Sequence, residues 1–143
     1  MKKFYIAYGS NLNIEQMSWR CPTATIWGKG ILKGWTLIFR SMRDSAYATI
    51  KKEADSSVPV VVWEIDRRAE LSLDRYEGYP SFYYKEDIEV TLDNGEAITG
   101  MAYIMNQRAV PGIPSKSYVR TIMEGYLDNK LDLNYLERFL SAQ

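Results

Sequence analysis

The chain has 143 residues, a length that suits one domain, and we expect a single domain over residues 1–143. Its 46% hydrophobic and 25% charged residues are typical of a globular protein with a sizeable core. Lys plus Arg and Asp plus Glu both number 18, and the resulting zero net charge disfavours an electrostatic grip on nucleic acid or on an anionic membrane surface.

Histidine is absent and Cys21 is the only cysteine, and both facts restrict the available chemistry. Without histidine there is no Ser-His-Asp or Cys-His catalysis and no histidine-ligated metal site. A single cysteine forms neither an internal disulfide nor a cysteine-cluster metal site. We therefore expect acid-base chemistry from Asp, Glu, Lys or Tyr, with no metal and no cofactor.

Nothing in the sequence indicates a membrane protein. No apolar run is long enough to cross a bilayer, and the basic N-terminal residues are followed too soon by Gly9, Ser10 and Asn11 for a signal peptide. We expect a cytoplasmic location, with no membrane partner and no nucleic-acid partner.

The chain opens with a strand and a helix joined by a loop. Phe4–Ala7 has the aromatic and β-branched residues of a short buried strand, and Ile14–Trp19 is predicted to form helical turns. Asn13 and Gln16 fit a capping box, in which each side chain satisfies a backbone donor at the start of the helix.

The Tyr8–Leu12 loop between them has two interpretations. Gly9 permits either a positive φ or close approach of the backbone to a ligand. Free amides in such a loop, beside the positive end of a helix dipole, attract carboxylate or phosphate groups. The alternative is a tight strand-to-helix turn without a ligand, because loops of this composition are common.

The middle of the chain predicts short strands separated by breaks. In order, these are a strand at Ala24–Gly28, a break or bulge at Gly28–Gly30, a strand at Trp35–Phe39, an edge strand at Tyr47–Ile50, a polar turn at Ala54–Ser57 and a central strand at Val58–Ile65. Asp66 is then positioned to cap a helix over Arg67–Tyr76, which Gly78 and Pro80 would stop.

The last third predicts a hairpin and two helices. Asn94-Gly95 suits a type I′ turn between two strands. The expected elements are strands at Tyr84–Val90 and Ala97–Met105, a loop at Arg108–Pro114 and helices at Ser115–Leu127 and Leu131–Phe139, the last with Asp132 as a cap. Short, antiparallel-looking strands with few helices indicate an α+β domain built on a small curled sheet or barrel.

Glu77 is the candidate acid-base residue. It lies at the C-terminal end of a predicted helix, where the dipole disfavours an anion. Asp74, on the same helical face, would add like-charge repulsion, and the surrounding aromatic residues would exclude water. All three influences would raise the pKa of Glu77 toward neutrality. The alternative is an exposed glutamate before a helix-capping glycine.

Two motifs together resemble the γ-glutamylcyclotransferase family. Tyr8-Gly9-Ser10-Asn11-Leu12 lies near the N-terminus, and Leu73-Asp74-x-x-Glu77-Gly78 lies about halfway along the chain. The resemblance covers nearly the whole chain, including the apolar strand Val60–Ile65 and the Pro114–Tyr118 loop that enters a helix.

The resemblance implies a small mixed, largely antiparallel β-barrel with flanking helices and a small-molecule γ-glutamyl substrate. Glu77 would take a proton from the substrate α-amine, which then attacks the γ-carbonyl to release 5-oxoproline and a free amine or amino acid. The residues implied to bind the substrate are Tyr8, Gly9, Ser10, Asn11, Leu12, Tyr84 and Tyr118. For Tyr118, packing of the helix is an equal alternative.

One segment departs from the family pattern. Many bacterial members carry a basic residue soon after the Glu-Gly pair, whereas this chain has Phe82-Tyr83-Tyr84-Lys85. The sequence leaves open which of Tyr83, Tyr84 and Lys85 faces the pocket, because strand alternation sends neighbours to opposite faces. A second hypothesis is therefore a non-catalytic module that binds a small carboxylate, and a weaker third is a nucleic-acid or protein-interaction barrel.

Overall fold

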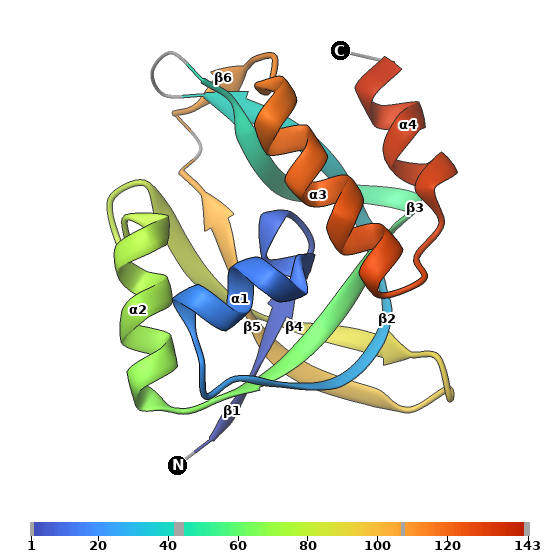
Figure 1. Ribbon diagram of the computed structural model, residues 1–143. Coiled ribbons are helices and arrows are strands. Elements are labelled where there is room, and N and C mark those ends of the chain that lie inside the picture. The colour runs from blue at the N-terminus through green and yellow to red at the C-terminus, as the bar shows by residue number, and fades with distance from the viewer. Residues whose placement is uncertain (1, 42–44, 107, 142–143) are drawn as a thin grey trace.

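A computed structural model describes residues 2–41, 45–106 and 108–141, and its central feature is a closed β-barrel (Figure 1). Within the described residues five strands close the barrel in the order β3-β1-β5-β4-β2, with β2 pairing back to β3. The strands are β1 (Lys3–Ala7), β2 (Thr25–Ser41), β3 (Tyr47–Ile65), β4 (Tyr83–Leu92) and β5 (Ala97–Met105). Only the β1–β5 pair is parallel among these neighbours, so the barrel is mixed and largely antiparallel, as expected.

Strands β2 and β3 are longer than the sequence predicted. Of the break or bulge expected at Gly28–Gly30, the structure has the bulge: the register shifts between Ile26 and Gly28, and the strand continues. Gly30 pairs with Leu92 of β4, and a Cβ there would collide with the backbone of that strand. The expected turn at Ala54–Ser57 also lies inside a strand, because an irregularity with Asp55 at φ +65° absorbs it.

The β4–β5 hairpin forms as predicted, but its turn differs from the expected type. Leu92 accepts a hydrogen bond from the N–H of Gly95 at 2.9 Å and donates its own N–H to Glu96 at 2.8 Å. Gly95 has φ +93°. This is a three-residue loop with glycine in a left-handed position rather than a two-residue type I′ turn. The predicted loop at Arg108–Pro114 also contains a short strand, β6 (Val110–Pro111), which pairs with the end of β2.

Helices cover the barrel on the face shown in Figure 1, where α1 lies between α2 and α3, and α4 lies beyond α3. They are α1 (Ile14–Arg20), α2 (Arg67–Glu77), α3 (Lys116–Asp128) and α4 (Leu133–Ser141). The caps at Asn13 and Asp66 form as predicted, each accepting a backbone N–H three residues on. None of the described helices has the length and apolarity needed to cross a membrane.

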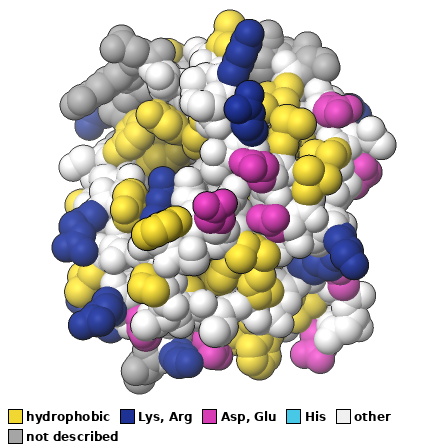
Figure 2. All heavy atoms as spheres, viewed as in Figure 1, with side chains coloured by type: hydrophobic (Ala, Val, Ile, Leu, Met, Phe, Trp, Pro, Cys, Tyr) yellow, Lys and Arg dark blue, Asp and Glu magenta, His cyan; other side chains and the backbone are white. Residues whose placement is uncertain are grey.

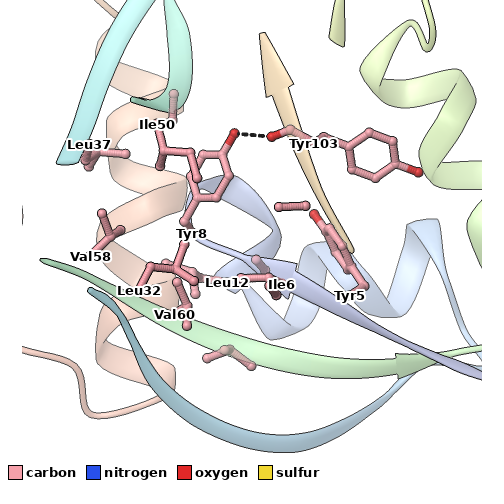
Figure 3. Close-up of a cluster of buried hydrophobic side chains, with 14 of the residues drawn as sticks. Tyr5, Ile6, Tyr8, Leu12, Leu32, Leu37, Ile50, Val58, Val60 and Tyr103 are labelled. Atoms are coloured by element: carbon pink, nitrogen blue, oxygen red, sulfur yellow. Dashed lines mark hydrogen bonds between the residues drawn. The ribbon is translucent and has the colours of Figure 1, made fainter. Parts of the chain in front are cut away.

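Aliphatic side chains fill one part of the barrel interior, and tyrosines fill another (Figure 3). The fully buried aliphatic residues in this view include Ile6, Leu12, Leu32, Leu37, Val58 and Val60. The Tyr8 hydroxyl donates a 2.6 Å hydrogen bond to the backbone oxygen of Tyr103. This tyrosine-rich end of the interior lies beside the loop that follows β1, and there the barrel becomes polar.

Candidate active site

The loop after β1 is a single 3₁₀ turn over Ser10–Leu12. The Trp63 indole donates to the backbone oxygen of Asn11 at 3.1 Å, and the Asn129 side chain donates to that of Leu12 at 2.8 Å. The backbone N–H groups of Ser10 and Asn11 find no acceptor among the residues that the structure describes. The turn is therefore held rigidly by its carbonyl groups and leaves N–H donors available to a ligand.

The buried side chain of Asn11 forms hydrogen bonds with three other side chains. Its Nδ2 donates to the Tyr5 hydroxyl at 2.8 Å. Its Oδ1 accepts from Arg20 at 2.9 Å and from Gln16 at 3.1 Å. Gln16 also donates to the backbone oxygen of Ser10, so its side chain does not reach back to Asn13 as the capping box predicted. Asn11 thus sets the position of a cation and of a tyrosine hydroxyl.

Gly9 is required for close approach and not for a positive φ. Its φ is −124°, so the left-handed option considered from the sequence is wrong. A Cβ at this position would lie 3.1 Å from the Ala48 Cβ and 3.6 Å from the Tyr118 hydroxyl. Any larger side chain would enter the space in front of Tyr118, so glycine keeps that space open.

Glu77 is the last residue of α2, before Gly78 at φ +65°. Burial raises the pKa of the Glu77 carboxyl to about 7, and the Arg20 charge opposes this rise. The repulsion from Asp74 that the sequence predicted does not contribute, because the Asp74 carboxylate pairs with Lys85 at 3.0 Å. Exclusion of water, one of the three expected influences, is the largest cause of the raised pKa, and it leaves a carboxyl that is half ionised near neutral pH.

Glu77 lies where a narrow inner chamber meets a wider outer one. The inner chamber has a cavity volume of about 30 Å³ and is lined by Tyr5, Tyr8, Gly9, Ser10, Asn11, Ala48, Glu77, Tyr83, Tyr103 and Tyr118. The outer chamber has about 290 Å³ and is lined by Ser10, Gln16, Arg20, Tyr47, Tyr76, Glu77, Phe82, Tyr83 and Tyr118. The loop and the carboxyl therefore face the same space, as their combination in the sequence predicted.

The tyrosine hydroxyls of the inner chamber are protonated donors. Burial raises the pKa values of Tyr5, Tyr8 and Tyr118. The Tyr8 hydroxyl donates its proton to the backbone oxygen of Tyr103, whereas the Tyr118 hydroxyl accepts a hydrogen bond from the backbone N–H of Ala48 at 3.0 Å. The hydroxyl proton of Tyr118 therefore remains available to another acceptor in the chamber.

Two of the residues predicted to bind substrate lie elsewhere. Tyr84 lines a separate groove with Trp35, on the opposite side of its strand from Tyr83, which lines both chambers. Of the residues whose direction the sequence left open, Tyr83 and not Tyr84 therefore lines the two chambers, since alternation along a strand reverses the face. Leu12 is fully buried and supports the loop from behind.

The lining residues that the sequence did not single out include Tyr5, Arg20 and Tyr103. The signal for Tyr5 was its place in a strand directly before the Gly9 loop. Arg20 and Tyr103 reach the site only through the barrel and helix packing, so no local pattern marks them. Among the described residues no group of three or more His, Cys, Asp or Glu side chains is arranged to hold a metal ion.

Comparisons with known proteins agree with one another. A model of the family described as "Gamma-glutamyl cyclotransferase, AIG2-like" matches residues 5–120. The gamma-glutamylcyclotransferases of Bos taurus and Homo sapiens are each 32% identical to this chain over 148 residues, covering 97% of it and 78% of each relative. A solved structure named gamma-glutamyl cyclotransferase has a TM-score of 0.89 at 30% identity and covers 97% of this chain and 86% of that one.

Proposed function

This chain belongs to the gamma-glutamyl cyclotransferase, AIG2-like family and is an enzyme of that type, and we propose that it cyclises a γ-glutamyl amino acid or γ-glutamyl amine. The products are 5-oxoproline and the free amino acid or amine. One observation carries the proposal: the Glu77 carboxyl, with its pKa raised to about 7, faces the same space as Ser10 and Asn11, whose N–H groups have no acceptor in the described part of the chain.

Glu77 is the proposed general base and then the general acid. Its carboxylate takes a proton from the substrate α-ammonium, and the freed amine attacks the γ-carbonyl carbon to form the new C–N bond of the ring. The bond to the departing nitrogen then breaks, and that nitrogen receives a proton from the Glu77 carboxylic acid. The ring nitrogen loses its extra proton to water and becomes the lactam N–H. A pKa near 7 suits both steps, because neither proton state is strongly disfavoured at neutral pH.

The loop and Tyr118 are proposed to hold the glutamyl group in a curled conformation. The N–H groups of Ser10 and Asn11 and the Tyr118 hydroxyl are the donors available to substrate oxygen atoms. Ring closure is intramolecular, so orientation alone can supply up to about 7–11 kcal/mol of the barrier reduction in favourable cases. The chemistry needs no group beyond these side chains and the substrate.

The test is a panel of γ-glutamyl dipeptides and γ-glutamyl amines, incubated with the wild-type protein and with Glu77→Gln. Accumulation of 5-oxoproline with at least one compound, and its loss in the variant, is the expected result. If no compound yields 5-oxoproline but one raises the melting temperature by binding, the chain is the non-catalytic carboxylate-binding module instead.

A further inference from the structure

The outer chamber has an aromatic wall. Tyr47 lies edge-on to Phe82, with ring centroids 6.3 Å apart, and to Tyr118, with centroids 5.1 Å apart. All three rings line the chamber, and Tyr47 remains 39% exposed. Figure 2 shows hydrophobic side chains gathered on the face between α2 and the start of α3, with a basic side chain beside them. The rings are in position to contact a planar apolar group.

Arg20 supplies a cation to the same chamber. Its guanidinium carbon lies 4.3 Å from the centre of the Tyr76 ring, and one of its nitrogens donates to Asn11. Among the described residues it forms no ion pair with an acid. A guanidinium has five N–H donors in a planar fork, so most of them remain available to a carboxylate.

The shapes of the chambers separate the two halves of a γ-glutamyl substrate. The inner chamber, with room for about two water molecules, can take only a small part of the substrate. The outer chamber is wider and is also lined by Glu77, the group that gives the departing nitrogen its proton in the proposed mechanism. The part of the substrate that varies in size therefore lies in the outer chamber and leaves through it.

We propose that the outer chamber is a leaving-group site for an aromatic α-amino acid, with the ring against Tyr47 and Phe82 and the carboxylate on Arg20. The preferred substrate is then a γ-glutamyl aromatic amino acid. This inference rests on the proposed cyclisation and adds the chemistry of the group that departs. It gives Tyr47 and Arg20 the role of specificity-determining residues.

The first experiment compares kcat/KM for γ-glutamyl-phenylalanine, γ-glutamyl-alanine and γ-glutamyl-phenethylamine by release of 5-oxoproline. We expect γ-glutamyl-phenylalanine to exceed γ-glutamyl-alanine by about 10-fold or more, since even small apolar differences give about 10–200-fold discrimination. We expect it to exceed the phenethylamine compound, which lacks the carboxylate, by about 10–100-fold. Equal values for all three would overturn the leaving-group site.

The second experiment assigns each preference to a residue through ratios, which cancel any common loss of activity. Tyr47→Ala should reduce the phenylalanine-to-alanine ratio, and Arg20→Gln should reduce the phenylalanine-to-phenethylamine ratio. The matched control is Trp19→Ala, a 78% exposed ring on α1 that does not line the chamber, which should change neither ratio. If Arg20→Gln leaves the phenylalanine-to-phenethylamine ratio unchanged, Arg20 does not bind the carboxylate of the leaving group and the proposal is wrong.

The experiments distinguish failure of the proposed cyclisation from failure of the leaving-group site alone. If no γ-glutamyl compound yields 5-oxoproline, the proposed cyclisation fails and the leaving-group site fails with it. If γ-glutamyl-alanine is cyclised as well as γ-glutamyl-phenylalanine, the cyclisation stands and only the aromatic preference is rejected.

Discussion

The Asp74 carboxylate accepts a 2.6 Å hydrogen bond from the Tyr103 hydroxyl. The Tyr103 ring lines the inner chamber and meets the Tyr5 ring at 5.8 Å, so an acid on α2 holds part of the chamber wall in place. The same carboxylate pairs with Lys85. Asp74 therefore contributes to the site by positioning a ring, although the motif spacing suggested that it repels Glu77.

Asp74→Asn tests this role. Because the change removes a charged hydrogen-bond acceptor, we expect a loss of about 1–3 kcal/mol in the free energy of unfolding. The pKa that governs kcat/KM should stay where it is, because Asp74 does not perturb Glu77. Urea denaturation and a pH-rate profile measure the two effects. A clear decrease of that pKa in Asp74→Asn would show instead that repulsion from Asp74 raises the pKa of Glu77.

Glu77→Gln removes the proposed base and keeps the size of the side chain. Turnover should fall by about 10²–10⁴, the usual contribution of a positioned acid-base residue. Burial raises the pKa of Glu77 from 4.5 to about 7, so the folded state prefers the neutral acid. The stability that this preference provides is complete below pH 4.5 and is lost as the pH rises through 7.

The same variant therefore has a pH signature in stability. Its free energy of unfolding should exceed that of the wild type by about 1–3 kcal/mol above neutral pH and match it in acid. Thermal melts at several pH values, alongside the 5-oxoproline assay, give both readings. A variant with full turnover would remove Glu77 from the mechanism, and one that unfolds would give it a structural role.

The pH dependence of activity should follow the ionisation of Glu77. The value of kcat/KM is expected to rise with pH to a plateau, with a midpoint near the pKa of about 7. Arg20 lowers that pKa, so Arg20→Gln should move the midpoint to higher pH, and the charge-conserving Arg20→Lys should move it less. Profiles between about pH 5 and about pH 9 are sufficient. If the midpoint of the kcat/KM profile is the same in the wild type and in both Arg20 variants, the midpoint does not belong to Glu77.

Gly9→Val and Ser10→Ala separate the backbone of the loop from its side chains. Valine would place carbon atoms near the Ala48 Cβ and the Tyr118 hydroxyl, where substrate is expected to bind, so ligand binding should be lost. Alanine at position 10 keeps the N–H and should cost far less affinity. Calorimetry with the product 5-oxoproline measures both, after circular dichroism confirms folding. Unchanged binding by Gly9→Val would show that this loop is only a turn.

Gly125→Ala tests how α3 supports the loop. A Cβ at Gly125 would lie 2.6 Å from the Leu12 Cβ and 2.7 Å from the Asn13 nitrogen. We expect overpacking to cost about 1–3 kcal/mol and to lower the melting temperature by about 4–10 °C. Glu124→Ala, on the exposed face of the same helix, is the control. Equal melting temperatures for the two variants would contradict this close packing.

The sequence was sufficient for elements with local signals. Asp66 and Gly78 mark the two ends of α2 as predicted. A cap oxygen and a left-handed glycine act on backbone groups only a few residues away, so their effect can be recognised from the local sequence. The motif around Gly9 and the end of α2 at Glu77 could be placed for the same reason. The polar turn expected at Ala54–Ser57 was wrong, since pairing along β2 and β3 outweighs the local preference for a turn.

Tertiary structure alone decided which groups surround Glu77. Tyr83 rather than Tyr84 faces the chambers because the register of β4 on β5 sets the alternation, and register depends on pairing between distant segments. Arg20 reaches the site through Asn11, and Lys85 neutralises Asp74. The pKa of Glu77 depends on burial and on the Arg20 charge, which are properties of the folded arrangement. Sequence determined the identity of the acid, and only the fold determined its environment.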